Sequence, residues 1–324
     1  MTSTTRIQAK LGSGLDPKSE PADILAGKNF GGQVAVVTGG YSGIGLETTR
    51  ALADAGMKVY VPVRTPQKAQ EALSTIAKGE VIPVAMDLGD FASVRRAVAE
   101  ILEEEARIDL LINNAGIMAC PEAHIEGQWE SQFGVNHLGH FVLTTGLLPA
   151  LLAADSARVV CLSSSGHKLS GIRWDDINFE QSPYDKWVAY GQAKTANALF
   201  ALGLDQRYAD QGLRAFSVHP GGIMTPLQRH LDKEEMIALG WLGEDGELSE
   251  LAAPLFKSPS QGCTTTLWAA TSDLLDGKGG LFCEDCDVAQ LLGEEPSRFF
   301  GVMPWAVDSE QAERLWALSE AAVA

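Results

Sequence analysis

The segment TGGYSGIGLE, residues 38–47, constrains the fold of this chain more than any other stretch. It follows the apolar run 34–37 and opens a helical pattern that begins at Gly43. Three glycines in such a place form a tight turn, or they let a pyrophosphate approach the backbone N–H groups at the helix N-terminus. Glycine is frequent in this chain, 33 of 324 residues, so the motif alone leaves both interpretations open. In either case, the segment marks a strand–turn–helix unit.

Apolar, strand-like segments alternate with helical patterns from residue 33 onward. Fully apolar strands separated by helices are typical of a parallel sheet that is covered on both faces. Right-handed crossovers make such a sheet doubly wound, and ligands bind at the carboxyl ends of its strands. The sequence therefore predicts an α/β fold with a doubly wound parallel sheet of about seven strands and helices on both faces. The expected strands are 33–38, 58–63, 81–85, 109–112, 157–162, 213–218 and 279–282, and the expected helices are 43–55, 66–77, 91–106, 129–152 and 187–210.

The chain divides into a short leader and one large domain. Residues 1–31 are polar and lack the apolar core of a signal peptide, so we expect a partly flexible leader. Residues 32–324 form the domain and end in a helical extension. The regular pattern is interrupted at about 224–261, where Gly, Glu, Asp, Pro and Leu predominate. Because an insertion at the carboxyl end of a strand lies over the predicted site, it is either a substrate lid or a surface excursion without function.

The charge of the chain excludes several kinds of partner. The formal charge is −17, with 42 acidic and 25 basic residues. Such a surface repels nucleic acids and anionic membranes, so we expect neither as a partner. No apolar run reaches the roughly 18 residues that span a bilayer, which predicts a cytoplasmic protein. The expected partner is a small molecule, and a homo-oligomer is compatible with the sequence.

The cysteines and histidines do not indicate a metal site. Cys283 and Cys286 have the spacing of a zinc knuckle, but no second pair with matching spacing lies nearby. A structural zinc needs four ligands, so two reduced thiols in a late loop are the preferred interpretation. The six histidines also lack a metal-binding spacing. We therefore expect chemistry without a metal.

Two basic residues indicate which cofactor the predicted fold would bind. Arg64 lies 19 residues after Gly45, at the end of the second strand, and Lys68 lies one helical turn further on. In a dinucleotide fold this position faces the adenosine ribose, where an acidic residue would bind the 2′-hydroxyl. An arginine instead pairs with a 2′-phosphate. Arg64 is therefore a solvated surface residue or, as we prefer, a ligand of NADP, with NAD as the alternative cofactor.

A second group of polar residues is suited to proton transfer. Tyr190 and Lys194 are four residues apart and lie on one face of the helix predicted over 187–210. A nearby ammonium stabilises tyrosinate and lowers the pKa of the phenol. Ser163–Ser165 follow the fifth strand, and Asn113–Gly116 follow the fourth, so both groups lie at the carboxyl edge of the sheet. Asn136 lies within the predicted helix 129–152, where an amide is a poor helix former.

Together these motifs resemble the short-chain dehydrogenase/reductase family over about residues 32–290, which implies a single-domain Rossmann fold. Residues 38–45 match the TGxxxGxG cofactor turn of that family, 113–116 match its NNAG signature, and 220–225 resemble its PG motif beside the nicotinamide. The resemblance implies a catalytic tetrad of Asn136, Ser164, Tyr190 and Lys194, with Ser165 as the alternative serine. It also implies cofactor contacts from Tyr190, Lys194, Gly39, Tyr41, Ser42, Gly43, Ile44, Gly45, Asp87, Leu88, Asn114, Ala115, Gly116, Pro220, Gly221, Ile223 and Thr225.

The segments VNHLGHF, SSSGH and GGLFCEDC are most similar to the retinol dehydrogenase/WW-domain oxidoreductase branch. The expected function is an NADP-dependent oxidoreductase that interconverts a ketone or aldehyde and an alcohol by hydride transfer, with Tyr190 as general acid/base. Apolar residues in the insertion favour a bulky, uncharged, lipophilic substrate. An alternative is a non-catalytic protein that senses NADP on the same fold. Such sensors have usually lost the Tyr or the Lys, and this chain retains both.

Overall fold

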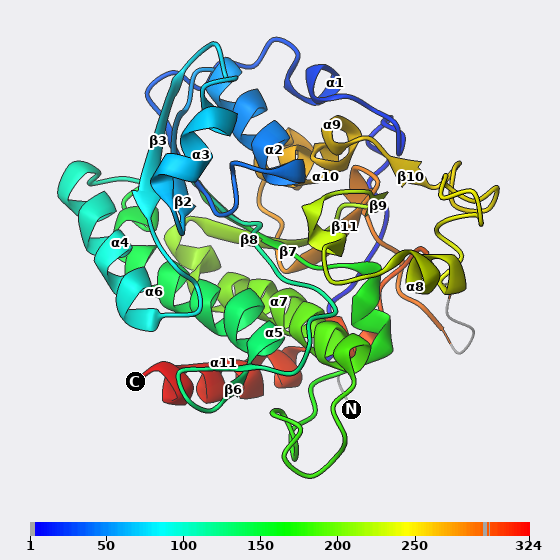
Figure 1. Ribbon diagram of the computed structural model, residues 1–324. Coiled ribbons are helices and arrows are strands. Elements are labelled where there is room, and N and C mark those ends of the chain that lie inside the picture. Colours follow the sequence, from blue (N-terminus) through cyan, green and yellow to red (C-terminus); the bar gives the residue numbers. More distant parts are fainter. Residues whose placement is uncertain (1–3, 294–296, 298) are drawn as a thin grey trace.

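The central sheet of the computed structural model, which describes residues 4–293, 297 and 299–324, follows the predicted doubly wound pattern (Figure 1). Within these residues the sheet has eight strands in the order β12-β11-β8-β7-β4-β1-β2-β3. All neighbours pair in parallel except β12, which is antiparallel to β11. The strands are β1 (Val34–Val37), β2 (Lys58–Val63), β3 (Glu80–Ala85), β4 (Leu110–Asn113), β7 (Ala157–Leu162), β8 (Leu213–His219), β11 (Leu281–Glu284) and β12 (Asp287–Val288).

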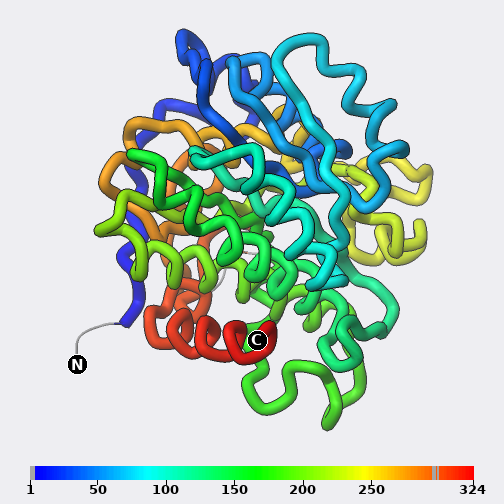
Figure 2. Tube along the Cα trace, turned by 90° about the vertical axis from the view of Figure 1, so that its left-hand side faces the viewer, coloured from blue at the N-terminus to red at the C-terminus, as the bar shows by residue number. Residues whose placement is uncertain are grey.

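Helices cover both faces of this sheet (Figures 1 and 2). One face carries α1 (Pro21–Leu25), α2 (Gly43–Asp54), α3 (Pro66–Leu73), α9 (Pro259–Gly262) and α10 (Thr264–Thr271). The other face carries α4 (Phe91–Glu104), α6 (Gly139–Leu151), α7 (Lys186–Tyr208) and α11 (Ser309–Val323). The remaining helical turns are α5 (Ser131–Phe133), α8 (Lys233–Ala238), the π-helix η1 (Gly134–Leu138) and the 3₁₀ turns η2 (Ser165–Leu169), η3 (Ala209–Gln211), η4 (Pro226–Gln228), η5 (Asp273–Leu275) and η6 (Pro304–Val307).

The first strand shows why the sequence folds in this way. All four residues of β1 are buried. Successive side chains of a strand point to opposite faces, so Val34 and Val36 pack in the core under α4, α6 and α7, whereas Ala35 and Val37 pack under α2 and α10. A strand with no polar side chain is stable only between two layers of helices. The apolar strands in the sequence therefore determine the three-layer arrangement.

The C-terminal helix α11 adds a layer outside α7 and α6. Trp316 of α11 packs against Phe141 and Phe200, with ring centroids 5.1 Å and 5.8 Å apart. As a result, residues 189–205 of α7 are all buried, although the helix lies at one side of the sheet. Figure 2 shows α11 in red across the green helices.

Residues 4–31 lie along the domain surface and are bound to it. The Arg6 backbone N–H donates to the Val307 carbonyl at 2.7 Å, and the Leu11 N–H donates to Asp287 Oδ1 at 2.7 Å. Ile24 of α1 is buried against α10. The expected leader therefore contributes contacts to the fold, and its residues 1–3 lie outside the described residues.

Several predicted element bounds differ from the structure. The helix predicted over 129–152 is divided into β6 (Trp129–Glu130), α5, η1 and α6, because β6 pairs with β5 (His124–Ile125) and the chain then turns into a π-helix. The helix predicted over 66–77 ends at Leu73. The sheet has one more strand than the predicted seven, since β12 has only two residues and gives no periodic signal.

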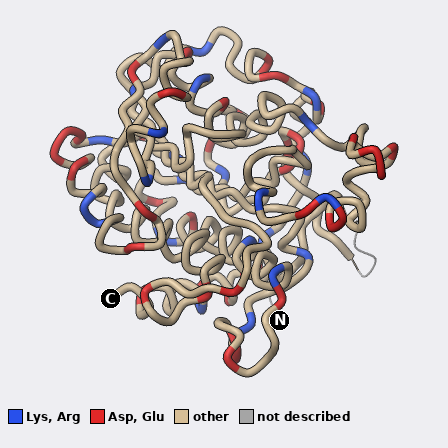
Figure 3. The backbone as a smooth tube through the Cα atoms, viewed as in Figure 1, with Lys and Arg blue, Asp and Glu red and all other residues tan. Residues whose placement is uncertain are grey.

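The insertion predicted at 224–261 folds into short elements over one end of the sheet. It contains η4, α8 and β10 (Phe256–Lys257), which pairs in parallel with β9 (Gly222–Ile223). Its tip carries the exposed acidic residues Glu244, Asp245, Glu247 and Glu250, and Figure 3 shows acidic residues on the corresponding loop. Among the described residues, no helix has the length and apolar character needed to cross a membrane.

Candidate active site

The glycine turn joins β1 to α2 in a backbone form that requires glycine. Gly39 and Gly43 have φ angles of +66° and +51°, in the left-handed region. At Gly45, a β-carbon would collide with the Gly39 carbonyl oxygen and with the Asn114 amide. The turn therefore lies directly against the segment that follows β4.

The N-terminus of α2 fits an anionic phosphate group. Ser42 is the N-cap residue, but its side chain makes no cap hydrogen bond. The first N–H groups of a helix have no partner within the helix, and the helix dipole favours negative charge there. The glycines leave the approach free of side chains, and Tyr41 and Ile44 lie half-buried beside it. These features match the pyrophosphate of a dinucleotide cofactor.

Two cations lie beyond the end of β2, where the sequence predicts the adenosine ribose. Arg64 and Lys68 are both exposed. Neither side chain makes a hydrogen bond or ion pair with any residue that the structure describes. Both charges are thus available for a ligand. The positions fit the 2′-phosphate of NADP.

Asp87 and Leu88 follow β3, the neighbour of β2, at the carboxyl edge of the sheet. The Gly89 N–H donates to Asp87 Oδ1 at 2.9 Å, which fixes the turn, and Leu88 is buried. A β-carbon at Gly139 would collide with the Leu88 carbonyl oxygen, so α6 packs closely on this segment.

Thr38 connects the glycine turn to the segment that follows β4. Its hydroxyl oxygen accepts hydrogen bonds from the backbone N–H groups of Asn114 and Ala115, each at 2.9 Å. The Asn114 side chain donates to the Thr38 carbonyl at 2.8 Å. His140 of α6 completes the group, because its Nε2 lies 2.8 Å from the Thr38 hydroxyl.

The hydrogen bonds of His140 determine its tautomer. Its Nδ1 lies 2.9 Å from the Asn136 carbonyl oxygen, which can only accept, so Nδ1 carries the proton. Nε2 therefore accepts from the Thr38 hydroxyl. Burial lowers the pKa of His140 to about 4, which keeps the ring neutral. One neutral histidine thus links the glycine turn to the backbone of Asn136.

Asn136 lies in η1, where the wider π-helical turn directs its side chain toward residues 116–117. Its Oδ1 accepts from the Ile117 N–H at 2.8 Å, and its Nδ2 donates to the Ile117 carbonyl at 2.9 Å. A β-carbon on Gly116 would lie 3.2 Å from Asn136 Oδ1 and 3.6 Å from Lys194 Nζ. Asn136 and Lys194 therefore flank the same glycine. Single π-turns occur often at functional sites.

The three serines after β7 have different partners. Ser163 is buried and donates to the Lys194 carbonyl at 2.8 Å. Ser164 lies beside Tyr190, and a hydrogen bond from the Ser164 side chain acts on the pKa of that tyrosine. The Ser165 N–H donates to His219 Nδ1 at 3.2 Å. Of the two candidates left open by the sequence, Ser164 is the one whose hydroxyl lies at Tyr190.

Tyr190 and Lys194 lie on α7 as predicted, and both are buried. Lys194 Nζ donates to the Leu162 carbonyl at 3.1 Å and lies 5.5 Å from the Tyr190 ring centroid. Burial raises the pKa of Tyr190 to about 12, and the Ser164 hydrogen bond acts in the opposite direction. Burial lowers the pKa of Lys194 to about 8. Desolvation of the phenol is therefore the largest effect on the pKa of Tyr190, and the low pKa that the spacing to Lys194 predicts is not the pKa of this geometry.

The PG segment faces the glycine turn from the other side. Gly221 has a φ of +105°, and Ile223 of β9 is buried. The side chain of Thr225 caps η4 by accepting from the Leu227 N–H at 3.3 Å. A β-carbon on Gly43 would lie 3.3 Å from Thr225. Pro220 to Thr225 and the start of α2 thus bound one space at the carboxyl edge of the sheet.

The insertion contributes an apolar cluster around Tyr190. Tyr190 packs with buried Met118, Ala119 and Leu231. Half-buried apolar residues complete the cluster, and most of them come from the insertion: Trp187, Leu227, Met236, Leu239 and Trp241. The segment at 224–261 therefore covers the end of α7 that carries Tyr190.

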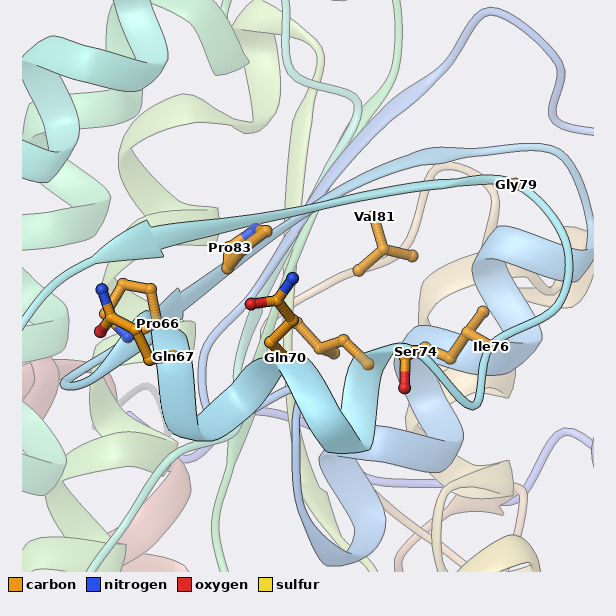
Figure 4. Close-up of a pocket in the computed structure, with 9 residues that line it drawn as sticks. Pro66, Gln67, Gln70, Ser74, Ile76, Gly79, Val81 and Pro83 are labelled. Carbon is orange, nitrogen blue, oxygen red and sulfur yellow. The ribbon is translucent and has the colours of Figure 1, made fainter.

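A shallow groove of about 450 Å³ lies elsewhere, between α3 and β3 (Figure 4). None of the predicted catalytic side chains lines it. It lies between a helix and an edge strand, so we do not assign the reaction to it. Its lining residues are Pro66, Gln67, Gln70, Leu73, Ser74, Ile76, Gly79, Val81 and Pro83. Among the described residues, no group of three or more His, Cys, Asp or Glu side chains could hold a metal ion.

A doubly wound sheet with a glycine turn after its first strand and a Tyr–Lys pair at its carboxyl edge defines a class of dinucleotide-dependent oxidoreductases. The model of the short chain dehydrogenase family matches residues 33–236, well over half of the chain. The protein therefore belongs to the short-chain dehydrogenase/reductase family.

Several known proteins are similar to this chain over most of its length. "Short-chain dehydrogenase/reductase prx1" of Penicillium roqueforti is 42% identical over 296 residues, covering 90% of this chain and 85% of the relative. "Retinol dehydrogenase 12" of Mus musculus is 37% identical over 292 residues, with 89% and 85% covered. The predicted likeness to the retinol dehydrogenase branch is thus confirmed.

Solved structures share the fold. A "putative uncharacterized protein from Mycobacterium Paratuberculosis" is 35% identical, with a TM-score of 0.71 and coverage of 94% of this chain and 97% of that one. The "Pseudomonas aeruginosa RhlG/NADP active-site complex" has a TM-score of 0.58 at 23% identity, over 79% of this chain and 95% of that one. At that identity the second comparison shows the fold alone.

Sequence reasoning missed several residues at this site. Thr38 and His140 were not assigned a role, although His140 lies four residues after Asn136 on the same helical face. Trp187 was missed although it lies three residues before Tyr190. Glu235 of the insertion also contacts the start of α7, and no sequence motif indicates this.

Proposed function

We propose that this oxidoreductase uses NADP to interconvert a ketone or aldehyde and an alcohol, with Tyr190 as the proton donor and acceptor. The observation that carries the proposal is that buried Tyr190 lies beside both the Ser164 side chain and Lys194, whose Nζ is 5.5 Å from the tyrosine ring centroid. NADPH, when bound, supplies the hydride for the carbonyl carbon. The chain's own residues position the substrate and move the proton.

Each polar residue has a role that follows from its surroundings. Ser164 donates a hydrogen bond to the substrate oxygen. A pKa of about 12 keeps Tyr190 protonated at neutral pH, so Tyr190 can donate its proton to the oxygen of a carbonyl that is being reduced. Lys194, with a pKa of about 8, is mainly cationic at pH 7 and favours the tyrosinate that this donation leaves. Asn136 lies beside Lys194 and supports a water that leads protons to solvent.

The substitution Tyr190→Phe tests this assignment. It removes the hydroxyl and little volume, so turnover should fall at least about a hundredfold, since general acid–base catalysis is typically worth 10² to 10⁴. NADPH oxidation with a panel of aldehydes and ketones measures turnover, and NADPH fluorescence measures binding, which should persist. Near-normal turnover in a folded variant would refute the role of Tyr190. A wild-type protein that binds NADPH but turns over no carbonyl would favour the NADP-sensing alternative.

The apolar cluster around Tyr190 supports a lipophilic substrate. The side chains that pack around Tyr190 are largely apolar, and the formal net charge of −17 disfavours the approach of anions. We therefore expect the protein to prefer a bulky neutral ketone, aldehyde or secondary alcohol. Specificity constants for matched pairs, such as a keto ester and the corresponding keto acid, provide the measurement. A clear preference for the acid would contradict this proposal.

A further inference from the structure

One carboxylate of the insertion binds two residues at the start of α7. Glu235 of α8 places Oε2 at 2.6 Å from Lys186 Nζ and accepts a hydrogen bond from the Trp187 indole Nε1–H at its Oε1, at 3.0 Å. The two oxygens therefore have different partners. The contact with Lys186 is a charge-assisted hydrogen bond, and the contact with Trp187 fixes the orientation of its indole ring.

The position of this carboxylate strengthens the contact. Lys186 and Trp187 are the first two residues of α7, whose N-cap is Asp185. The positive end of the helix dipole lies there and favours a nearby negative charge. Glu235 is itself held in place, because its backbone N–H donates to the N-cap residue Asp232 at 2.8 Å. Only about a quarter of its side chain is exposed, which limits competition by water.

Trp187 forms a wall beside the predicted reaction centre. Its ring makes edge-to-face contacts with Tyr190 at 6.4 Å and with Trp241 of the insertion at 6.2 Å. Trp241 in turn packs edge-to-face with Phe256 at 6.0 Å. The indole that Glu235 holds thus touches both the predicted proton donor and the covering segment.

Other polar groups of the insertion bond within it or to residues outside α7. At its C-terminal end, Lys257 pairs with Asp285 at 2.6 Å and Ser260 donates to Glu20 at 2.5 Å. Lys233 donates to the Glu244 carbonyl at 2.8 Å, Ser249 to the Gly240 carbonyl at 2.6 Å, and Arg229 to the Pro226 carbonyl at 3.1 Å. These bonds shape the insertion but do not attach it to α7. The attachment between α8 and α7 therefore combines apolar packing with the two contacts of the Glu235 carboxylate, to Lys186 and to Trp187.

We propose that Glu235 determines substrate specificity, by fastening the insertion to α7 and fixing Trp187 as a wall of the substrate site. A bulky substrate contacts this wall and the fastened insertion, whereas a small substrate reaches Tyr190 without them. The effect on substrates rests on the function proposed above. The fastening itself does not depend on that function.

Glu235→Gln tests the effect on specificity. The amide keeps an acceptor for the indole N–H and loses the charge that binds Lys186. With decanal as the bulky aldehyde, kcat/KM should fall about tenfold, mainly through a higher KM, as expected for the loss of one charge-assisted hydrogen bond. With propanal it should change less than about twofold. Glu234→Gln is the matched control, because Glu234 is the exposed neighbour on the same helix, and both aldehydes should behave as with wild type.

Trp187→Phe tests whether the indole is the element that Glu235 controls. It keeps an aromatic ring and removes the N–H, so it should lower the decanal-to-propanal preference by a similar factor. The double variant with Glu235→Gln should lose little more than either single variant. Equal losses for both aldehydes, or fully independent effects of the two substitutions, would overturn the specificity proposal.

Hydrogen exchange gives a readout that does not require turnover. Peptides from residues 226–255 should exchange at least about fivefold faster in Glu235→Gln than in Glu234→Gln, because opening of the insertion no longer has to break the ion pair. Unchanged protection would refute the fastening even in an active enzyme. If Glu235→Gln exchanges faster but the wild-type protein turns over no carbonyl, the inference that Glu235 fastens the insertion still holds. Only the proposed function is then refuted.

Discussion

At the residue scale, Arg64 is the side chain on which the choice of cofactor depends. It is exposed and has no partner among the described residues, so its charge is free to bind a phosphate. We expect Arg64→Asp to weaken NADPH binding by at least about tenfold, since a charge-assisted contact becomes a repulsion. NADH binding should change less or improve. Fluorescence titration with both cofactors measures the effect.

The control for this substitution is Lys78→Asp, which makes the same charge change at an exposed lysine near the start of β3, at the amino-terminal edge of the sheet. It should leave both affinities nearly unchanged. If Lys78→Asp weakens NADPH binding as much as Arg64→Asp does, the loss comes from the change in net charge. The assignment of Arg64 as the ligand of the 2′-phosphate then fails. A wild-type preference for NADH would also contradict it.

The sequence predicted the place of Arg64 directly after β2, because the distance along the chain from a glycine turn to the end of the next strand varies little. Its contact with a 2′-phosphate remains a prediction. The sequence could not distinguish Ser164 from Ser165. Three successive serines follow β7. The Ser163 hydroxyl donates to the Lys194 carbonyl, the Ser164 side chain bonds to Tyr190, and the contact of Ser165 with His219 is made by its backbone N–H. The pKa of Tyr190 was also beyond sequence reasoning, because the spacing of Tyr190 and Lys194 shows proximity but not burial.

At the scale of elements, Thr38 joins the ends of β1 and β4 to α6. We expect Thr38→Val to lower the free energy of unfolding by about 3 kcal/mol, because it leaves two backbone N–H groups and His140 Nε2 without their partner. Thr38→Ser keeps the hydroxyl and loses one methyl group, which costs about 1 kcal/mol. Urea unfolding of both variants measures the difference. Equal losses would show that the hydroxyl contributes no more than the methyl group, which would contradict the role given to its hydrogen bonds.

The region before α6 shows where a periodic pattern fails to predict an element. Residues 129–152 have enough apolar residues for a continuous helix, and the structure instead places a strand pair, α5 and a π-turn before α6. A π-turn depends on one extra residue per turn, which apolar periodicity cannot resolve over five residues. Asn136 gave the one local signal, since an amide is disfavoured in a helix interior.

At the scale of the whole molecule, the sheet and its layers could be predicted because β1, β4 and β7 are buried along their entire length. Such strands require helices on both sides. The packing of α11 over α7 could not be predicted, since the last helix alone does not show which surface Trp316 covers. A cytoplasmic location and a homo-oligomer remain predictions, which cell fractionation and light scattering would test.

The core built around α6, α7 and α11 contains histidines that are buried in the neutral form. Burial lowers the pKa of His137 to about 3 and those of His140 and His167 to about 4, from an ordinary value of 6.5. His137 Nε2 lies 2.7 Å from the Ser319 hydroxyl of α11, and this hydroxyl donates to the Leu315 carbonyl. Nε2 therefore carries the ring proton and donates a hydrogen bond to the Ser319 oxygen. A second proton on the ring would have no buried acceptor at Nδ1.

Because these histidines are buried in the neutral form, we expect the free energy of unfolding to fall in mild acid. Their folded pKa values lie below the unfolded value, so their stabilising effect is complete above pH 6.5 and is lost as the pH falls toward 4. By pH 5.5, each of them lowers the free energy of unfolding by about 1.4 kcal/mol, because the unfolded chain binds a proton that the folded chain excludes. His137→Leu removes one such group, so its stability relative to wild type should rise by about that amount between pH 7.5 and 5.5. Urea unfolding at both pH values measures this, and pH 5.5 remains above the sequence pI of about 4.7. The control is His124→Gln at an exposed position, and a pH dependence equal to that of the control would show that His137 takes up its proton in the folded protein as well.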